Sequence, residues 1–432
     1  MARICAIGIC AALTAGLATP ALAQATAAAD AGHTAWMLTA TALVLFMTLP
    51  GLALFYAGLV RLKNALSVMA HCVAIACLAS ILWLAVGYSL AFSGSGPLIG
   101  DFAKAGLVSV TREARAGLIP ENLFFMFQMT FAIITPALII GAVVERIRFG
   151  AVMLFSGLWL LVVYVPVCHW VWGGGWLMGR HVMDYAGGLV VHATAGSSAL
   201  VLAWRLGKRD GFPRELSPPH SPGLTMIGAG MLWVGWYGFN AGSALAADQS
   251  AAAALTATHL SAASAGLVWA LIEYSRFKRA SMIGLVTGVV AGLATVTPAS
   301  GFVGPLGGAV LGAAGSLVCY QAVDWVKHRL VIDDSLDVFA VHGIGGILGT
   351  LLVALLASPS LGGAGYAPGV TMGGQALTQV IGVGVTVAWS ALATLALAVI
   401  VRRTVGLRAR DEHIEEGLDM AAHGERAWHP NP

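Results

Sequence analysis

Charged residues are scarce in this chain. Among its 432 residues there are 23 Lys and Arg and 20 Asp and Glu, about 10 % in total, whereas soluble domains average roughly 25 %. Hydrophobic residues make up 58 % of the chain, and the mean hydropathy is +0.83. Water cannot be the main solvent of such a surface. The composition therefore excludes a soluble enzyme, a disordered chain and a nucleic-acid-binding protein. It predicts that the chain is embedded in a lipid bilayer.

Motifs for metal, cofactor or covalent chemistry are also lacking. The six Cys form no CxxC pair and no Cys/His metal spacing, so we interpret them as small packing residues. There is no HExxH, no Gly-rich phosphate loop and no set of nucleophile, base and acid on neighbouring helix faces. We therefore predict no cofactor, no metal site and no catalytic residue, and a protein that is not an enzyme.

Residues 1–23 have the pattern of a secretory signal peptide. Arg3 precedes a short apolar run, and Ala21-Leu22-Ala23 ahead of Gln24 is an A-x-A-type cleavage site. A retained first helix is the alternative, but the apolar run is short and Pro20 interrupts its end. We assign 24–403 to a transmembrane domain and 404–432 to a cytoplasmic tail.

The rest of the chain divides into long stretches that contain no Asp, Glu, Lys or Arg. A membrane-spanning helix needs about 20 apolar residues. Most stretches therefore hold one span, and the last two hold two spans each, divided near Pro298 and in the Gly-rich segment Ser358–Gly374. This predicts an all-α integral membrane protein with eleven spans, from the stretches 31–60, 64–100, 122–144, 149–179, 185–204, 216–247, 249–272, 280–323 and 338–401.

The distribution of positive charge predicts the orientation. With the N-terminus outside, 18 Lys and Arg lie in inner loops and the tail, and four lie in outer loops (Lys104, Arg112, Arg115 and Arg180). Cytoplasmic loops carry the excess of Lys and Arg in membrane proteins. We therefore predict that the mature N-terminus faces out and the C-terminus faces in.

Two pairs of similar short segments indicate an internal repeat. Phe55-Tyr56-Ala57-Gly58 in span 1 resembles Phe239-Asn240-Ala241-Gly242 in span 6, and Val191-His192-Ala193 in span 5 resembles Val341-His342-Gly343 in span 10. The matching elements are five spans apart, an odd number, so the two halves should be inverted in the membrane. Inverted repeats are typical of transporters, with a binding site near the midplane. The fold class predicted is two inverted five-helix repeats followed by one long C-terminal helix.

His192 and His342 occupy equivalent positions of this repeat. A polar side chain inside a span is costly and is a functional candidate by default. A single such histidine is more often a core residue bonded to a backbone carbonyl. Two at equivalent positions favour a pair that lines a path for a small polar molecule or relays a proton, because a neutral imidazole can donate and accept.

Aromatic residues and one carboxylate near the outer ends of spans are further candidate site residues. An interfacial aromatic belt explains Trp170 and Trp176, but not Phe131 and Phe239, which lie inside their spans. Aromatic faces can hold a desolvated cation without a permanent carboxylate. Asp184, just before span 5, is interpreted first as a helix cap and second as a direct ligand.

Several of these segments together resemble the ammonium transporter (Amt) family, over nearly all of the mature chain. The resemblance is carried by Phe127-Gln128-Met129-Thr130-Phe131, Trp172-Gly173-Gly174-Gly175, Asp184-Tyr185-Ala186-Gly187-Gly188, Gly238-Phe239-Asn240-Ala241-Gly242-Ser243, Asp337-Val338-Phe339-Ala340-Val341-His342-Gly343 and the tail segment Glu416-Gly417-Leu418-Asp419. Met129 and Thr130 depart from it, since smaller residues are expected there.

The resemblance implies a homotrimer in the bacterial cell membrane with one hydrophobic pore in each subunit. It implies an outer ammonium site of Phe131, Trp172 and Ser243, a gate of Phe131 and Phe239, and a twin-histidine pair, His192 and His342. Asp184, Tyr164 and Trp236 would support the outer site. Ser243 favours the Amt branch over Rhesus-type relatives. The tail resembles the segment that docks PII-type signal proteins.

The function expected is uptake of ammonium, with methylammonium as a candidate substrate. The ion would be recruited at the outer site and deprotonated, and ammonia would pass the histidine pair with or without the proton. The rival interpretation is an ammonium sensor that signals through its tail, although only about 29 residues follow Arg403. A potassium or sodium channel would need carbonyl or carboxylate filters.

Overall fold

The computed structural model describes residues 29–215 and 217–428. The predicted signal peptide lies outside these residues. Among them, ten helical segments are long and apolar enough to cross a membrane. The eleventh predicted span is helix α9 (Pro222–Gly242), which is 21 residues long. Glycine, tryptophan and Asn240 lower its hydropathy, but its length suffices for a span. The eleven predicted spans thus correspond to eleven helical segments.

The first five spans run from residue 31 to residue 206. Several of them change from α-helix to a π-helical or 3₁₀ turn along their length. Span 1 contains α1 (Ala31–Phe46), a π turn (Met47–Leu52) and α2 (Ala53–Leu59); span 2 contains a 3₁₀ turn (Leu62–Asn64), α3 (Ala65–Leu82), a π turn (Trp83–Gly87) and α4 (Tyr88–Phe92); span 3 is α5 (Glu121–Ile140); span 4 contains α6 (Phe149–Trp159), a π turn (Leu160–Tyr164) and α7 (Val165–Trp172); span 5 contains a π turn (Gly188–Ala193) and α8 (Thr194–Leu206).

The remaining six spans run from residue 222 to residue 404. After α9 come α10 (Gln249–Phe277), α11 (Met282–Val296) with a 3₁₀ turn (Thr297–Ala299), α12 (Pro305–Asp324) with a π turn (Trp325–Leu330), a π turn (Phe339–Gly343) with α13 (Ile344–Leu356), and α14 (Met372–Thr404). The tail contains α15 (Asp411–Glu416) and a π turn (Asp419–His423), and the loops contain short 3₁₀ turns (Ala105–Leu107, Met178–Arg180, Pro359–Leu361).

Helix starts follow local sequence signals. Side chains of Asp30, Ser221, Asp248, Ser281 and Thr371 accept a hydrogen bond from a backbone N–H in the first turn of α1, α9, α10, α11 and α14. These are the residue types that satisfy the unpaired N–H groups of a helix start. Within residues 29–215 and 217–428 there is one short strand pair, in which β1 (Arg115–Ala116) pairs antiparallel with β2 (Ile119–Pro120) in the loop before α5.

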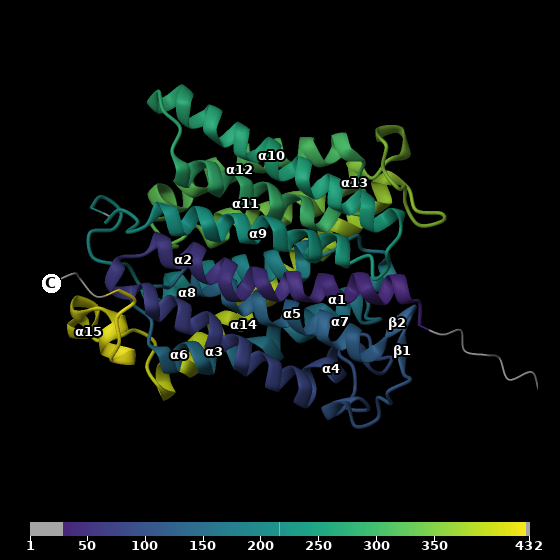
Figure 1. Ribbon diagram of the computed structural model, residues 1–432, viewed down its shortest axis with the longest axis horizontal. Helices are drawn as coiled ribbons and strands as arrows, with labels where there is room; N and C mark the ends of the chain where they lie inside the picture. The colour runs from purple at the N-terminus through teal and green to yellow at the C-terminus, as the bar shows by residue number, and fades with distance from the viewer. Residues whose placement is uncertain (1–28, 216, 429–432) are drawn as a thin grey trace, which may run out of the picture.

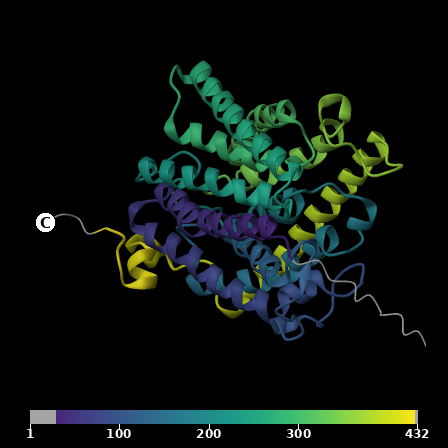
Figure 2. The same cartoon turned by 45° about the vertical axis from the view of Figure 1, so that its right-hand side comes forward.

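The helices run side by side along the long axis of the molecule (Figure 1). α1 begins at the right-hand end of this view, and α15 lies at the left-hand end. We call these the N-end and the tail end. Figure 2 shows α14, in yellow-green, passing obliquely across the other helices. Because eleven consecutive spans alternate in direction, Trp172, Asp184 and Ser243 come to the N-end.

Small residues allow the helices to approach closely, as is typical of membrane proteins. A Cβ built on Gly312 of α12 would lie 2.1 Å from the backbone oxygen of Ser261 on α10. A Cβ built on Gly196 of α8 would lie 2.2 Å from Cα of Gly343. The second contact joins the helices that carry the two predicted histidines, so it sets how near these histidines can lie.

Candidate functional site

Two aromatic rings meet at the N-end of the helices. Phe131 on α5 and Trp172, the last residue of α7, pack edge to face with ring centroids 5.8 Å apart. Phe127 packs on Phe131 with centroids 5.0 Å apart. Phe131 is 1 % exposed, whereas Trp172 is partly exposed. This aromatic cluster is therefore open toward the surface on the side of Trp172 and closed on the side of Phe131.

Ser243 ends α9 at the same end. Its hydroxyl donates to the backbone oxygen of Phe239 at 2.8 Å, so Oγ keeps lone pairs that can accept a hydrogen bond from a ligand. The neighbouring Gly242 packs on Phe127, since a Cβ built there would lie 2.9 Å from the Phe127 ring. Trp172 and Ser243 are both partly exposed. The predicted outer site thus offers aromatic rings and an oxygen acceptor.

Phe131 and Phe239, the residues of the predicted gate, contact each other below this cluster. Their ring centroids are 4.4 Å apart with an interplanar angle of 37°, and Phe239 is fully buried. The Phe239 ring also stacks on the imidazole of His192 at 6.0 Å and 20°. The predicted gate residues therefore lie in contact with each other and directly above the first histidine.

His192 and His342 form a stacked pair, with ring centroids 5.2 Å apart and an interplanar angle of 23°. Both are almost fully buried. They line an enclosed cavity of about 10 Å³ together with apolar side chains (Met47, Leu52, Phe55, Ile134, Leu138, Val191, Leu232, Trp236, Phe239 and Val290). A volume of this size is near the minimum that holds one water-sized molecule.

The nitrogens of this pair are unusual for buried polar atoms. Among the residues that the structure describes, neither nitrogen of His192 nor Nδ1 of His342 has a hydrogen-bond partner. Buried polar groups are nearly always hydrogen-bonded, and exceptions call for an explanation such as a ligand. By contrast, the ring nitrogens of the buried His169 lie 2.8 and 2.6 Å from the backbone oxygens of Ala91 and Gly96.

A larger cavity of about 350 Å³ lies on the tail-end side of the pair. His342, Phe55 and Val290 line both cavities, so His342 stands between them. The larger cavity is also lined by polar and charged residues, Arg209, Ser217, Lys327, Ser335 and Asp337. The succession from N-end to tail end is thus an aromatic cluster, two phenylalanine rings in tilted contact, an apolar cavity with two imidazoles and a polar cavity.

Asp184 caps the helix that carries His192. Its carboxylate accepts backbone N–H groups of four consecutive residues, Gly187 to Val190, at 2.5–3.1 Å. Burial raises the pKa of this carboxyl above its ordinary value, and the four N–H bonds oppose that rise. The backbone oxygen of Asp184 accepts the indole N–H of Trp172 at 2.8 Å. The capping role expected from the sequence is therefore present, and it links His192 to Trp172.

Asp334 is the equivalent cap in the second half of the chain. It precedes His342 by eight residues, as Asp184 precedes His192, and it accepts N–H bonds from Val338 and Phe339 at 3.0 and 2.7 Å. Burial and the charge of Asp337 raise its pKa to about 7. Sequence reasoning missed this residue, although its spacing to the histidine repeats that of Asp184 and was the available signal.

Trp236 and Tyr164 take different places. The Trp236 ring stacks on His192 at 5.6 Å, and its N–H donates to Thr297 Oγ1 at 2.9 Å. Trp236 therefore packs against His192, and its ring centroid also lies 5.6 Å from that of Phe239. Tyr164 is buried in the π turn of span 4, where its ring contacts Trp83 at 6.2 Å.

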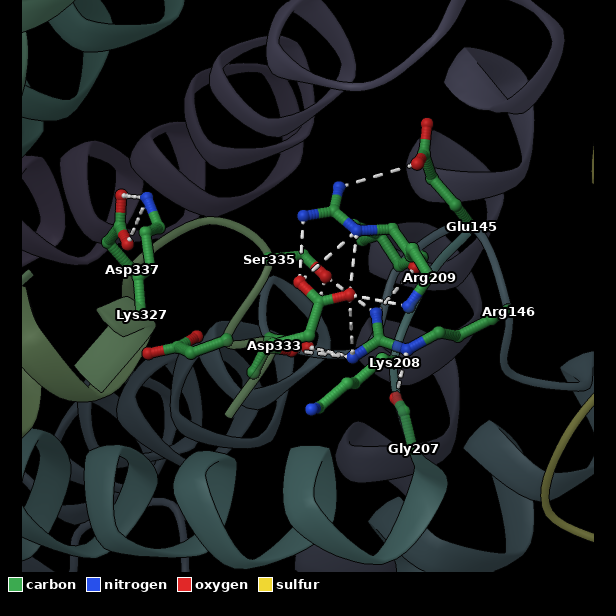
Figure 3. Close-up of polar contacts among 12 residues, drawn as sticks. Glu145, Arg146, Gly207, Lys208, Arg209, Lys327, Asp333, Ser335 and Asp337 are labelled. Atoms are coloured by element: carbon green, nitrogen blue, oxygen red, sulfur yellow. Dashed lines mark hydrogen bonds and ion pairs between the residues drawn. The ribbon is translucent and has the colours of Figure 1, made fainter. Parts of the chain in front are cut away.

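A charged network lies at the tail end (Figure 3). Arg146 is fully buried and donates to the backbone oxygen of Asp333 and to Ser335 Oγ, each at 2.6 Å. Arg209 pairs with Asp333 at 2.8 Å and with Glu145 at 3.4 Å. Burial raises the pKa of Asp333, but the hydrogen bonds and charges of the two arginines outweigh it, so the pKa lies below its ordinary value. The network joins three loops beside the larger cavity.

Comparison with known proteins decides the family. The model of the Ammonium Transporter Family matches residues 35–428. The chain is 44 % identical over 400 residues to ammonium transporter Amt1 of Archaeoglobus fulgidus, covering 92 % of this chain and 99 % of that protein. It is 43 % identical over 402 residues to an ammonium transporter of Bacillus subtilis, covering 92 % and 98 %. The chain belongs to the ammonium transporter family.

Solved structures agree with this assignment. A sensor Amt protein matches the transporter with a TM-score of 0.85 at 28 % identity, over 91 % of this chain and 98 % of that one. Mep2 of Saccharomyces cerevisiae matches with a TM-score of 0.80 at 34 % identity, over 89 % and 88 %. The protein is thus an all-helical, multi-pass ammonium transporter and not an enzyme.

Proposed function

We propose that the transporter recruits ammonium at the N-end, between Phe131, Trp172 and Ser243. Each favourable contact between a cation and an aromatic face contributes about 0.5–2 kcal/mol. Oγ of Ser243 can accept one N–H of the ion, because its own proton is donated to the Phe239 carbonyl. The site therefore fits a small cation that carries hydrogen-bond donors.

Ammonium gives its proton to water at the partly exposed N-end before it passes Phe131 and Phe239, and ammonia continues. Burying an unpaired ammonium ion among apolar side chains is far more costly than burying a neutral molecule. The observation that carries the proposal is the set of unpartnered nitrogens of His192 and His342 in a cavity of about 10 Å³. A neutral imidazole can accept from or donate to one ammonia molecule there. Whether the proton follows through the pair decides if transport is electrogenic.

The N-end is the outer face in this proposal, and the larger cavity is the cytoplasmic exit. The excess of Lys and Arg in the tail-end loops supports this orientation, and cleavage of residues 1–23 would leave the transmembrane domain 24–403 with its tail 404–432 inside. The matching π turns and aspartate caps at His192 and His342 support an inverted repeat. A bacterial inner membrane is the location proposed.

A homotrimer and a PII-type partner complete the proposal. Tyr237 and His259 form a hydrogen bond of 2.7 Å on an exposed face of α9 and α10. Polar groups that face lipid in mid-span are costly, which supports cover by a second copy. The tail lies beside the first tail-end loop, since Asp419 accepts N–H bonds from Leu66 and Ser67. This place supports docking of a signal protein near the exit.

An ammonium sensor is the second candidate, because the sensor Amt protein shares this fold over 91 % of the chain. A transporter carries a flux of ammonium across the membrane, whereas a sensor need not. Ammonium-driven changes of internal pH in proteoliposomes, followed by stopped-flow fluorescence, should be saturable for the wild type. Trp172→Leu should raise the KM for ammonium. An absence of wild-type flux would refute transport and favour the sensor, and an unchanged KM in the variant would refute the outer site.

A further inference from the structure

Gln379 is a fully buried amide on α14, the helix that follows the two five-span halves. Its side-chain oxygen accepts the backbone N–H of Met183 at 2.9 Å. Its side-chain nitrogen donates to the backbone oxygens of Met183 and Thr350 at 2.7 and 2.9 Å. Gln375 lies one turn earlier. Its side-chain nitrogen donates to the side-chain oxygen of Gln379 at 3.1 Å and to the backbone oxygen of His181 at 3.0 Å. Both ends of the Gln379 amide are therefore engaged in fixing other backbone segments.

The first of these segments is the turn that contains Asp184. Met183 directly precedes Asp184, whose backbone oxygen accepts from Trp172 and whose carboxylate caps the helix of His192. Gly382, one turn beyond Gln379, faces the same turn, because a Cβ built there would lie 3.2 Å from the side chains of Leu189 and Val182. α14 thus holds the backbone on both sides of Asp184.

The second segment is the helix of His342. Thr350 lies on α13, two turns beyond this histidine, and a Cβ built on Gly188 would lie 2.7 Å from Thr350 Oγ1. A Cβ built on Gly346 of α13 would lie 2.6 Å from Cβ of His192. The two histidine-bearing helices touch here, and one amide from a third helix bonds to the turn before the first of them and to the second.

We propose that Gln379 is a positioning residue for ammonium transport. It fixes the Met183–Val190 turn against α13, and through Asp184 it holds Trp172 at the outer site and His192 opposite His342. The inference rests on the outer site and histidine pair of the proposed function. An apolar residue at 379 would leave the N–H and the backbone oxygen of Met183 without their partners inside the helix bundle, so the turn would have to shift.

Hydrogen–deuterium exchange by mass spectrometry tests the position directly, on the full-length protein in proteoliposomes. Gln379→Leu should accelerate exchange in peptides covering 187–190 by at least about tenfold, since these N–H groups depend on Asp184. Thr394→Val is the matched control, because Thr394 is also buried on α14 but donates to Ser198, away from the turn. This control should leave the exchange of 187–190 unchanged.

Stopped-flow flux on the same vesicles tests the consequence. Gln379→Leu should raise the KM for ammonium about 10- to 100-fold, as expected for a small misplacement of site residues, and Thr394→Val should leave it unchanged. Gln379→Glu should restore both readouts in large part, because a protonated glutamic acid keeps the acceptor and one donor. If the leucine variant does not fold, Gln379→Glu compared between acidic and alkaline pH supplies the same test, with ionisation removing the donor.

The outcomes separate this inference from the proposed function. Unchanged exchange at 187–190 in Gln379→Leu would overturn the positioning role, whatever the flux. Faster exchange with an unchanged KM would overturn the link between the turn and transport. Failure of the proposed function itself would appear in the wild type, as an absence of saturable flux, or in Trp172→Leu, as an unchanged KM.

Discussion

The pH dependence of stability should depend strongly on one buried carboxyl, that of Asp334. Its pKa is raised from 3.8 to about 7 by burial and by Asp337, against two N–H bonds and Lys327. The titratable groups that face the Asp334 carboxyl are Asp337 and Lys327, which form an ion pair at 2.7 Å, and the buried phenol of Tyr56. Between pH 4 and 7 the folded protein therefore holds a proton that the unfolded chain has lost.

The sign and size of the effect follow from this difference. The free energy of unfolding falls as pH rises wherever the folded state binds more protons. Each pH unit corresponds to about 1.4 kcal/mol, so the interval between 3.8 and about 7 corresponds to roughly 4 kcal/mol. The part that falls between pH 5 and pH 8 is roughly 3 kcal/mol. Stability from this group is thus full at low pH and lost as pH rises through about 7.

Asp334→Asn isolates the effect, because asparagine keeps an acceptor oxygen and stays neutral. Free energies of unfolding can be measured by SDS titration in mixed micelles, followed by tryptophan fluorescence, at pH 5 and pH 8. The variant should gain roughly 3 kcal/mol relative to the wild type over this interval. Asp337→Asn should move the wild-type transition to lower pH, because it removes a charge that raises the Asp334 pKa. A difference between Asp334→Asn and wild type that stays constant with pH would refute the reasoning.

Three further substitutions, one of them with a matched control, test packing and charge. Gly196→Ala places a Cβ 2.2 Å from Cα of Gly343. It should lower the free energy of unfolding by about 1–3 kcal/mol and abolish most of the ammonium flux. The control Gly230→Ala, with no atom within 4 Å of the new Cβ, should change neither the stability nor the flux. Phe239→Ala should lower stability by about 3–5 kcal/mol and admit a potassium current in proteoliposomes; continued exclusion of potassium would contradict the gate. Arg146→Met should lower the free energy of unfolding by about 3–5 kcal/mol in the SDS titration, and a neutral effect would show that the network is not stabilising.

Much of the fold was predictable because a bilayer imposes simple rules. The eleven spans follow from charge-free stretches, and the ends follow from capping residues and breaks. The second stretch, 64–100, ends as a helix at Phe92 because Ser93-Gly94-Ser95-Gly96-Pro97 cannot continue it. The proximity of His192 and His342 was predictable from the repeat, and the structure places their rings 5.2 Å apart.

Other parts of the site depend on contacts that have no sequence signature. The π turns that carry both histidines lie where the two helices approach closely, at Gly196 and Gly343. Gln379 is one of several polar residues in a long apolar helix, and its role follows only once α14 crosses the turn at Met183. The stacking of Trp236 on His192 likewise depends on how α9 rotates in the bundle.

Ammonium flux and ammonium-evoked current, recorded together in proteoliposomes of wild type and His192→Ala at several pH values, test the central claim most directly. The account predicts that removing the His192 imidazole from its cavity changes the flux of ammonia, its selectivity over potassium or the current. A current that disappears while ammonia flux survives would place proton movement in the histidine pair. If flux, selectivity and current were all unchanged in His192→Ala, passage of ammonia past the pair would be contradicted.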